Sequence, residues 1–153
     1  MNKDVLVLVH PEQAYVDIAP KFAGVVIERL ASETERRLSD GQKVYCLTGK
    51  HGVDRLAPSI WEFRNKICII PPPPFVGFDS QFLLAKQEVV EDERGNIALG
   101  GFARGMCVES TYRLFSGTEC ELKIRNNYIE AGQKILSLDV TQANFLINTR
   151  LDV

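Results

Sequence analysis

A cysteine that follows a pair of glycines is the residue of this sequence best placed for nucleophilic chemistry. Cys107 comes shortly after Gly100-Gly101, in the first turn of a helix expected from Arg104 to Phe115. The unpaired N–H groups of a helix start carry the positive end of the helix dipole, which favours a thiolate and can bind an oxyanion. The alternative interpretation is a buried cysteine that packs the helix onto a sheet.

A histidine and a glutamate follow the first apolar run of the chain. Val5–Val9 is continuously apolar, and His10-Pro11-Glu12 comes directly after it. A histidine near a cysteine can accept the thiol proton, as in the Cys–His hydrolases of other folds. His10 is therefore the candidate base for Cys107, oriented by Glu12 or Asp17. The alternative is a residue that only ends a strand and bonds to backbone.

A second group of polar residues follows the second apolar run. Lys50 and His51 come after Thr48-Gly49, and Lys50 supplies a positive charge there unless it is simply a solvated loop lysine. The residues expected to bind the substrate combine these two with positions near the first strand and the cysteine: Glu12, Lys50, His51, Phe75, Phe102, Ala103 and Arg104.

Neither a metal site nor a cofactor site is expected. The chain has two histidines, His10 and His51, on different strands, whereas a zinc site needs three or four well-placed ligands. The glycines Gly100, Gly101 and Gly105 do not follow the first strand, where the fingerprint of a dinucleotide-binding turn belongs. We therefore predict no metal and no cofactor.

Apolar runs and amphipathic segments alternate along the chain, and this pattern predicts alternating strands and helices. The expected strands are Val5–Val9, Val44–Leu47, Ile67–Ile70, Ile97–Leu99, Glu121–Ile124 and Ile135–Leu138. The expected helices begin at Pro20, Ala57, Asp79 or Ser80, and Arg104, and the first of them ends at Asp40-Gly41. Gly100-Gly101 is expected to form a turn, and Pro71–Pro74 an extended loop.

This alternation predicts a three-layer α/β fold with a doubly wound, mainly parallel sheet. With the strand order 3-2-1-4-5, the first and fourth strands are neighbours, and the chain direction reverses between them. Ligand sites of such sheets lie at the carboxyl ends of the strands at this switch point. The residues after Val9 are therefore expected to face Cys107 across one cleft, with the loop after the second strand close by.

Length and composition predict one soluble domain over residues 1–153. The chain is 45% hydrophobic and 25% charged, which is typical of a globular protein. A net charge of −2 gives no electrostatic reason to bind nucleic acid or an anionic membrane. No apolar run is long enough to span a bilayer, and Met1–Asp4 does not begin a secretory signal. We therefore expect a cytoplasmic protein whose four cysteines are free thiols.

The segment Gly100–Thr111 resembles the nucleophile segment of the isochorismatase-like cysteine hydrolases, which include nicotinamidases and N-carbamoyl amidases. In that family a glycine-containing turn leads to a Cys-Val pair, here Cys107-Val108, with a threonine a few residues later, here Thr111. The order of elements agrees over nearly the whole chain, which is shorter after the fifth strand. The resemblance implies the isochorismatase-like fold, a cysteine nucleophile that acts on a small-molecule substrate, and a homo-oligomer.

Two of the three catalytic positions implied by the resemblance carry other residues. The family uses an aspartate at the end of the first strand, a lysine after the third strand, and the cysteine. Here His10 occupies the aspartate position, and Pro71–Pro74 stands where the lysine is expected, with no lysine between Lys66 and Lys86.

These replacements leave two alternative functions for the protein. The first is a divergent hydrolase of small amides or related carbonyl compounds that uses Cys107 and His10. The second is a catalytically silent relative that binds a small ligand or a protein partner.

Overall fold

Five parallel strands form one sheet at the centre of the protein. The computed structural model describes residues 5–18, 20–73, 78–92, 96–102, 107–108, 111 and 121–123. The strands are β1 (Val5–Val9), β2 (Lys43–Leu47), β3 (Cys68–Ile70), β4 (Asn96–Gly101) and β5 (Glu121–Lys123). Their order is β3-β2-β1-β4-β5, and every neighbouring pair is parallel. The predicted strand order is confirmed.

Strand β1 lies in the middle of this sheet. All five of its residues are buried, and it pairs with β2 on one side and β4 on the other along its whole length. A strand that is paired on both edges and covered on both faces has no exposed position for a polar side chain, which explains the unbroken apolar run. The carboxyl end of β1 is the switch point of the sheet, because the chain winds outward from it in both directions.

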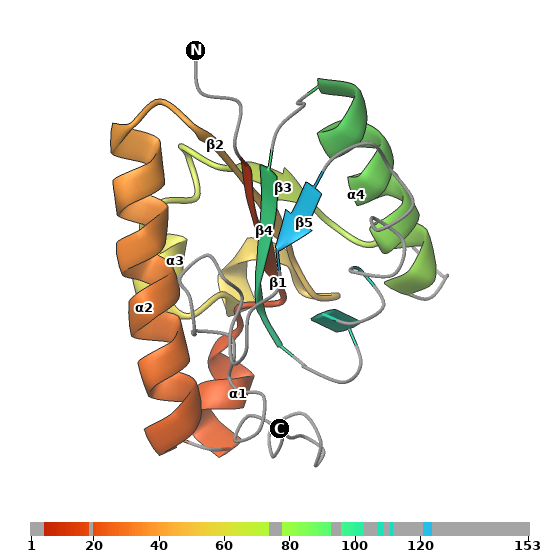
Figure 1. Ribbon diagram of the computed structural model, residues 1–153. Coiled ribbons are helices and arrows are strands. Elements are labelled where there is room, and N and C mark those ends of the chain that lie inside the picture. The colour runs from red at the N-terminus through yellow and green to blue at the C-terminus, as the bar shows by residue number, and fades with distance from the viewer. Residues whose placement is uncertain are drawn as a thin grey trace.

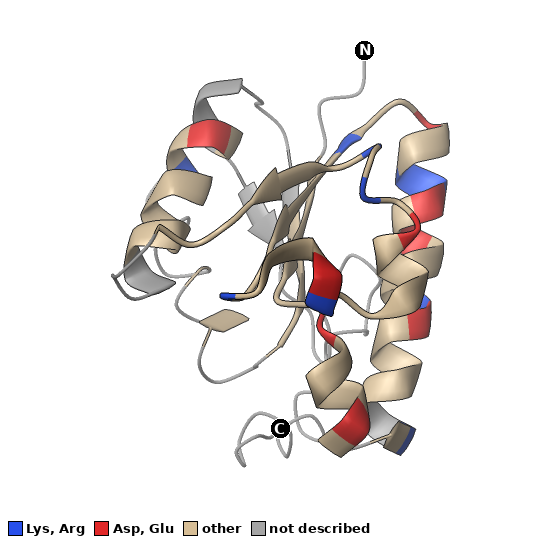
Figure 2. Cartoon of the chain, turned by 180° about the vertical axis from the view of Figure 1, so that it is seen from behind, with Lys and Arg blue, Asp and Glu red and all other residues tan. Residues whose placement is uncertain are grey.

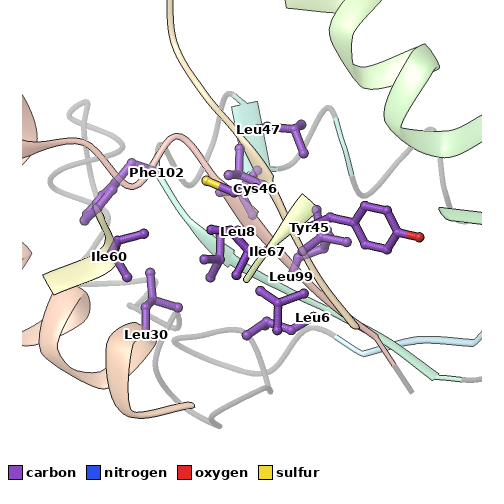
Figure 3. Close-up of a cluster of buried hydrophobic side chains, with 14 of the residues drawn as sticks. Leu6, Leu8, Leu30, Tyr45, Cys46, Leu47, Ile60, Ile67, Leu99 and Phe102 are labelled. Atoms are coloured by element: carbon purple, nitrogen blue, oxygen red, sulfur yellow. The ribbon is translucent and has the colours of Figure 1, made fainter. Parts of the chain in front are cut away.

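Helices cover both faces of the sheet. The long helix α2 (Pro20–Ser39) lies on one face with the short helices α1 (Gln13–Ile18) and α3 (Pro58–Trp61), and α4 (Phe78–Asp92) lies on the other (Figure 1). In the core, Leu30 of α2 and Ile60 of α3 lie on one side of the strands, whereas the Tyr45 ring points to the opposite side (Figure 3). The predicted three-layer α/β architecture is therefore confirmed.

The sequence pattern of α2 explains both its buried face and its end. Charged residues of both signs lie along the helix (Figure 2), and Glu33 pairs with Arg37 as their four-residue spacing predicts, at an Nε–O distance of 2.7 Å. The chain leaves the helix through Gly41, whose φ of 78° suits glycine. The buried side chains recur every three or four residues: Ala23, Val26, Ile27, Leu30 and Thr34.

Several elements differ from the sequence-based prediction or lie beyond the described residues. Helix α1 was not expected, because it has no buried residue and so leaves no apolar stripe in the sequence. The helix expected from Ala57 is the shorter α3, followed by turns, and a 3₁₀ helix over Gly52–Arg55 precedes it. The expected strand Ile135–Leu138 lies outside the described residues, and the assignment of one domain stays a prediction.

Gly100 and Gly101 belong to β4 and do not form the expected turn. They pair with Leu8 and Val9 of β1, so the fourth strand continues as far as the central strand does. Gly101 has a φ of 138°, and a Cβ atom there would collide with the Val9 carbonyl group. Glycine is required at this position both by its backbone conformation and by the close approach of the two strands.

Replacing Gly101 with alanine should lower the free energy of unfolding by more than about 3 kcal/mol, because the methyl group meets backbone that cannot move aside. Urea unfolding followed by circular dichroism measures this loss. Gly24→Ala is the matched control, since nothing lies within 4 Å of a Cβ at that position in α2, and it should stabilise the protein by about 0.5–1 kcal/mol. Equal effects at the two positions would contradict the close approach of β1 and β4.

Candidate functional site at the carboxyl edge of the sheet

The carboxyl edge of the sheet carries most of the residues predicted to form the site. Those described there follow β1, β2 and β4 along the chain: His10, Glu12, Lys50, His51, Phe102 and Cys107. Other predicted residues lie outside the described part of the chain, so their roles stay predictions: Phe75, Ala103 and Arg104. The switch point thus gathers residues from three separate parts of the sequence.

His10 leaves β1 in an unusual backbone conformation. Its φ is 49°, in the left-handed region that residues other than glycine adopt rarely, asparagine, aspartate and histidine most often among them. Its N–H donates to the Leu47 carbonyl oxygen at 2.9 Å, and its own carbonyl oxygen accepts from the Glu12 N–H at 2.8 Å. These backbone bonds turn the chain sharply and leave the His10 side chain only 3% exposed. Such conformations are concentrated at functional sites.

The His10 ring is held by a glutamine that sequence analysis did not single out. Its Nε2 lies 2.9 Å from Oε1 of Gln81, a fully buried residue of α4. The Gln81 Nε2 donates to the carbonyl oxygens of Thr48 and Ile70, at 2.7 Å in each case. One side chain therefore joins the residue after β1 to the carboxyl ends of β2 and β3.

A sequence signal for Gln81 does exist, in the pattern of α4. Gln81 precedes the buried residues Ala85 and Val89 at four-residue spacing, so it is a polar residue on the apolar face of a helix. The two residues expected to orient His10 have other partners. Glu12 accepts a hydrogen bond from the Gly49 N–H, and the exposed Asp17 accepts one from the Gln13 side chain.

Burial lowers the pKa of His10, and the hydrogen bond to Gln81 only partly opposes this effect. The charged imidazolium loses its hydration in a buried site, whereas the neutral ring loses little. His10 is therefore neutral at pH 7, which is the form that can accept a proton.

Glu12 is half-buried beside the loop that follows β2. Its carboxylate accepts a hydrogen bond of 2.6 Å from the Gly49 N–H, and a Cβ atom at Gly49 would collide with the same carboxylate. Burial raises the pKa of Glu12, while the Gly49 N–H and the positive charges of His51 and Arg55 oppose that rise. Glu12, His51 and Arg55 therefore form one electrostatic group, and Lys50 is exposed in the same loop.

Tyr15 interacts electrostatically with both the glutamate and the cysteine. Its ring stacks on Phe102, with the ring centroids 4.6 Å apart. Burial raises the pKa of Tyr15, and the negative charges of Cys107 and Glu12 raise it further, so both groups lie near its hydroxyl. Phe102 itself has no exposed surface and packs in the core, and its expected contact with a substrate stays a prediction.

Cys107 differs from the other described cysteines in its position. Cys46, Cys68 and Cys107 are not joined by disulfides, as predicted for each of these three. Cys46 is fully buried within β2, where burial raises its pKa. Cys68 is the first residue of β3, so it lies at the amino end of that strand, away from the carboxyl edge of the sheet. Cys107 is half-buried in a helical turn, and its carbonyl oxygen accepts a 2.8 Å hydrogen bond from the Thr111 hydroxyl.

Two further classes of site were searched for over the described ranges. These residues hold no group of three or more His, Cys, Asp or Glu side chains placed to bind a metal ion. Within the same ranges, no helix has the length and hydrophobicity needed to cross a membrane.

Comparison with known proteins identifies the fold. No protein-family model matches the sequence, and no curated protein matches it. Among solved structures, an isochorismatase from Pseudomonas putida is similar, with a TM-score of 0.60 and 14% sequence identity. The similarity covers 79% of this chain and 68% of that chain. The chain therefore has an isochorismatase-like α/β fold, as the resemblance of Gly100–Thr111 implied.

Replacing His10 with asparagine should remove one source of pH dependence from the stability. The pKa of His10 is lower in the folded state, so the unfolded state binds a proton first as the pH falls, and the wild type loses stability below about pH 6.5. The His10→Asn variant should not lose stability in this way, because it has no imidazole to protonate at this position. Asparagine also tolerates the left-handed backbone. Urea unfolding at pH 8 and pH 5 measures the difference. The same pH dependence in both proteins would contradict a buried neutral imidazole.

Replacing Glu12 with glutamine should change the stability with the opposite dependence on pH. The pKa of Glu12 is higher in the folded state, so its contribution to stability is fully present below about pH 4.5 and is lost as the pH rises through the folded pKa. Glutamine keeps an oxygen acceptor for Gly49, so Glu12→Gln should gain stability relative to the wild type between pH 4 and pH 7. Glu62→Gln, at an exposed position, is the matched control. If the difference in stability between Glu12→Gln and the wild type stays constant across this range, burial of the charged Glu12 carboxylate does not lower the stability.

Proposed function

We propose that this protein is a divergent cysteine hydrolase that acts on a small amide or a related carbonyl compound. The observation that carries the proposal is that two reactive side chains follow adjacent strands at the switch point of an isochorismatase-like sheet. A half-buried thiol, Cys107, follows β4, and a buried neutral imidazole, His10, ends the adjacent β1. This edge is where open α/β sheets bind their ligands.

The proposed reaction has two steps with His10 as the proton carrier. Cys107 Sγ attacks the carbonyl carbon while His10 takes the thiol proton, and N–H groups at the helix start bind the oxyanion. The C–N bond then breaks, and His10 delivers the proton to the leaving nitrogen. Water attacks the resulting thioester with His10 as base, and the thiolate leaves and regains that proton. One amide and one water give one carboxylic acid and one amine or ammonia.

A neutral base also explains why this sequence has no lysine after the third strand, where the resembled family has one. In the resembled family the base is an aspartate, and the lysine supports the charges of the site. A neutral imidazole introduces no negative charge in the resting site, so no buried cation is needed to balance it. The replacement of the aspartate by His10 and the loss of the lysine are then one change and not two. This argument favours a modified mechanism over a lost one.

The surrounding residues favour a small polar substrate. Glu12 follows β1, and Lys50 and His51 follow β2, so acidic, basic and imidazole groups at this edge are available to bind polar groups of a small molecule. A cytoplasmic location and assembly into a homo-oligomer belong to the same proposal.

Alkylation by iodoacetamide between pH 5 and pH 9, with the labelled cysteines mapped by mass spectrometry, tests this proposal. Cys107 should react faster than the other cysteines at neutral pH, because His10 removes its proton during attack. His10→Asn should slow Cys107 alkylation by roughly tenfold or more, since general-base assistance contributes about 10²- to 10⁴-fold. Asp17→Asn is the control, because Asp17 is exposed and bonded to Gln13.

Two outcomes decide between the hydrolase and the silent relative. Selective alkylation that depends on His10, together with ammonia release from a panel of small primary amides that Cys107→Ser abolishes, supports the hydrolase. Alkylation of Cys107 at the rate of an unperturbed thiol, unchanged by His10→Asn, would overturn it. The catalytically silent relative that binds a ligand or a protein partner would then be the better description.

A further inference from the structure

We infer that Gln81 is a positioning residue that fixes His10 in the tautomer with its hydrogen on Nε2, so that Nδ1 is the nitrogen that accepts a proton. The tautomer follows from the contacts of described residues alone. Its part in catalysis rests on the proposed function, in which Nδ1 takes the proton of Cys107.

The first step is the orientation of the Gln81 amide. Its nitrogen lies 2.7 Å from the carbonyl oxygens of Thr48 and Ile70. Carbonyl oxygens only accept hydrogen bonds, and an –NH₂ group has two hydrogens to donate. Turning the amide over would place its oxygen against two other oxygens in a fully buried site, which costs the desolvation of unpaired polar groups. The amide nitrogen therefore faces the strand ends, and Oε1 faces His10.

The second step is the position of the hydrogen on the ring. Oε1 of Gln81 is an acceptor without a hydrogen, so the Nε2 of His10, 2.9 Å away, must be the donor of their hydrogen bond. A neutral imidazole carries a hydrogen on one nitrogen only, and burial keeps this ring neutral. The lone pair of His10 is therefore on Nδ1.

The third step is the rigidity of the support. Gln81 has no exposed surface, and both hydrogens of its amide are used at the ends of β2 and β3. The His10 backbone is tied to β2 through the Leu47 carbonyl oxygen. The Phe82 ring lies beside the imidazole, with the centroids 6.0 Å apart. The ring thus contacts two residues of α4 while its backbone is tied to β2, which restricts its rotation and keeps the lone pair in one direction.

This arrangement gives Gln81 the position of the third member of a catalytic triad, with one electrical difference. A carboxylate in that position stabilises the imidazolium by a full charge, whereas the amide oxygen of Gln81 offers only a dipole. His10 therefore gains orientation without a large gain in basicity. The pKa of His10 remains below its ordinary value despite this hydrogen bond, which suits a base that releases its proton in the same catalytic cycle.

Nitrogen NMR on the intact protein tests the tautomer directly. The chain has two histidines, so a long-range ¹H–¹⁵N spectrum of protein labelled with ¹⁵N-histidine contains two imidazoles, and His10→Asn assigns them. At neutral pH we expect the His10 Nε2 to have the shift of a protonated nitrogen and Nδ1 that of an unprotonated one. Protonated Nδ1, or shifts averaged between the two nitrogens, would overturn the inference without any variant of Gln81.

Two substitutions then test whether Gln81 is the cause. Gln81→Leu removes the acceptor, so the His10 shifts should become averaged, and Cys107 alkylation should slow by roughly tenfold or more. Gln81→Glu keeps an oxygen for the Nε2 hydrogen and should retain the wild-type tautomer as the protonated acid, whose O–H can donate to one of the two carbonyl oxygens at the strand ends. Retention of the tautomer in Gln81→Leu would show that Gln81 does not fix it.

The same data separate this inference from the proposed function. If the wild type has the Nε2–H tautomer but Cys107 reacts like an ordinary thiol, the assignment of Gln81 stands and the hydrolase proposal fails. If His10 has the Nδ1–H tautomer while Cys107 alkylation depends on His10, the hydrolase stands with Nε2 as its base, and the assignment of Gln81 fails.

Discussion

The enclosure of β1 is the constraint on which the rest of this protein depends. The strand pairs on both edges and is buried at every residue, so its polar chemistry can begin only where the strand ends. His10 stands at that point in a left-handed conformation, which turns the chain out of the sheet within one residue. On the neighbouring strand, Gly101 permits an approach to Val9 that any side chain would prevent. The switch point is thus built from a tight turn on one strand and a missing side chain on the other.

A chain of neutral hydrogen bonds occupies the interior of the site. The amide of Gln81 joins the imidazole of His10 to two backbone carbonyl groups, and no member of this network needs to be charged. Ionised groups in such a buried position would lose their hydration and require close partners of opposite charge. The ionisable residues Glu12, His51 and Arg55 lie instead at the half-buried or exposed rim. This separation places the neutral proton acceptor inside and the groups suited to a polar substrate outside.

In an isochorismatase-like fold, the backbone defines where the ligand site lies. At 14% identity to a solved isochorismatase, the chain retains a similar fold. The direction of the strands and the switch point follow from connectivity, and so they persist when side chains change. Reactivity instead depends on individual polar atoms, and our proposal assigns it to Nδ1 of His10 and Sγ of Cys107. A shared fold therefore limits where chemistry can occur more than it limits which chemistry occurs.

The sequence alone determined where the described strands lie along the chain, the ends of α2 and the Glu33–Arg37 pair, because apolar runs, caps and four-residue spacings act between neighbours in the chain. The strand order was inferred from the alternation of strands and helices. The sequence also indicated the edge at which His10 and Cys107 would lie. Only the tertiary structure decided that Gly100-Gly101 extends β4, since that depends on pairing with β1. It likewise decided that Gln81 holds His10, a contact between residues 71 positions apart. Local patterns carry no information about which buried donor meets which acceptor, because that match is made only when distant elements pack together.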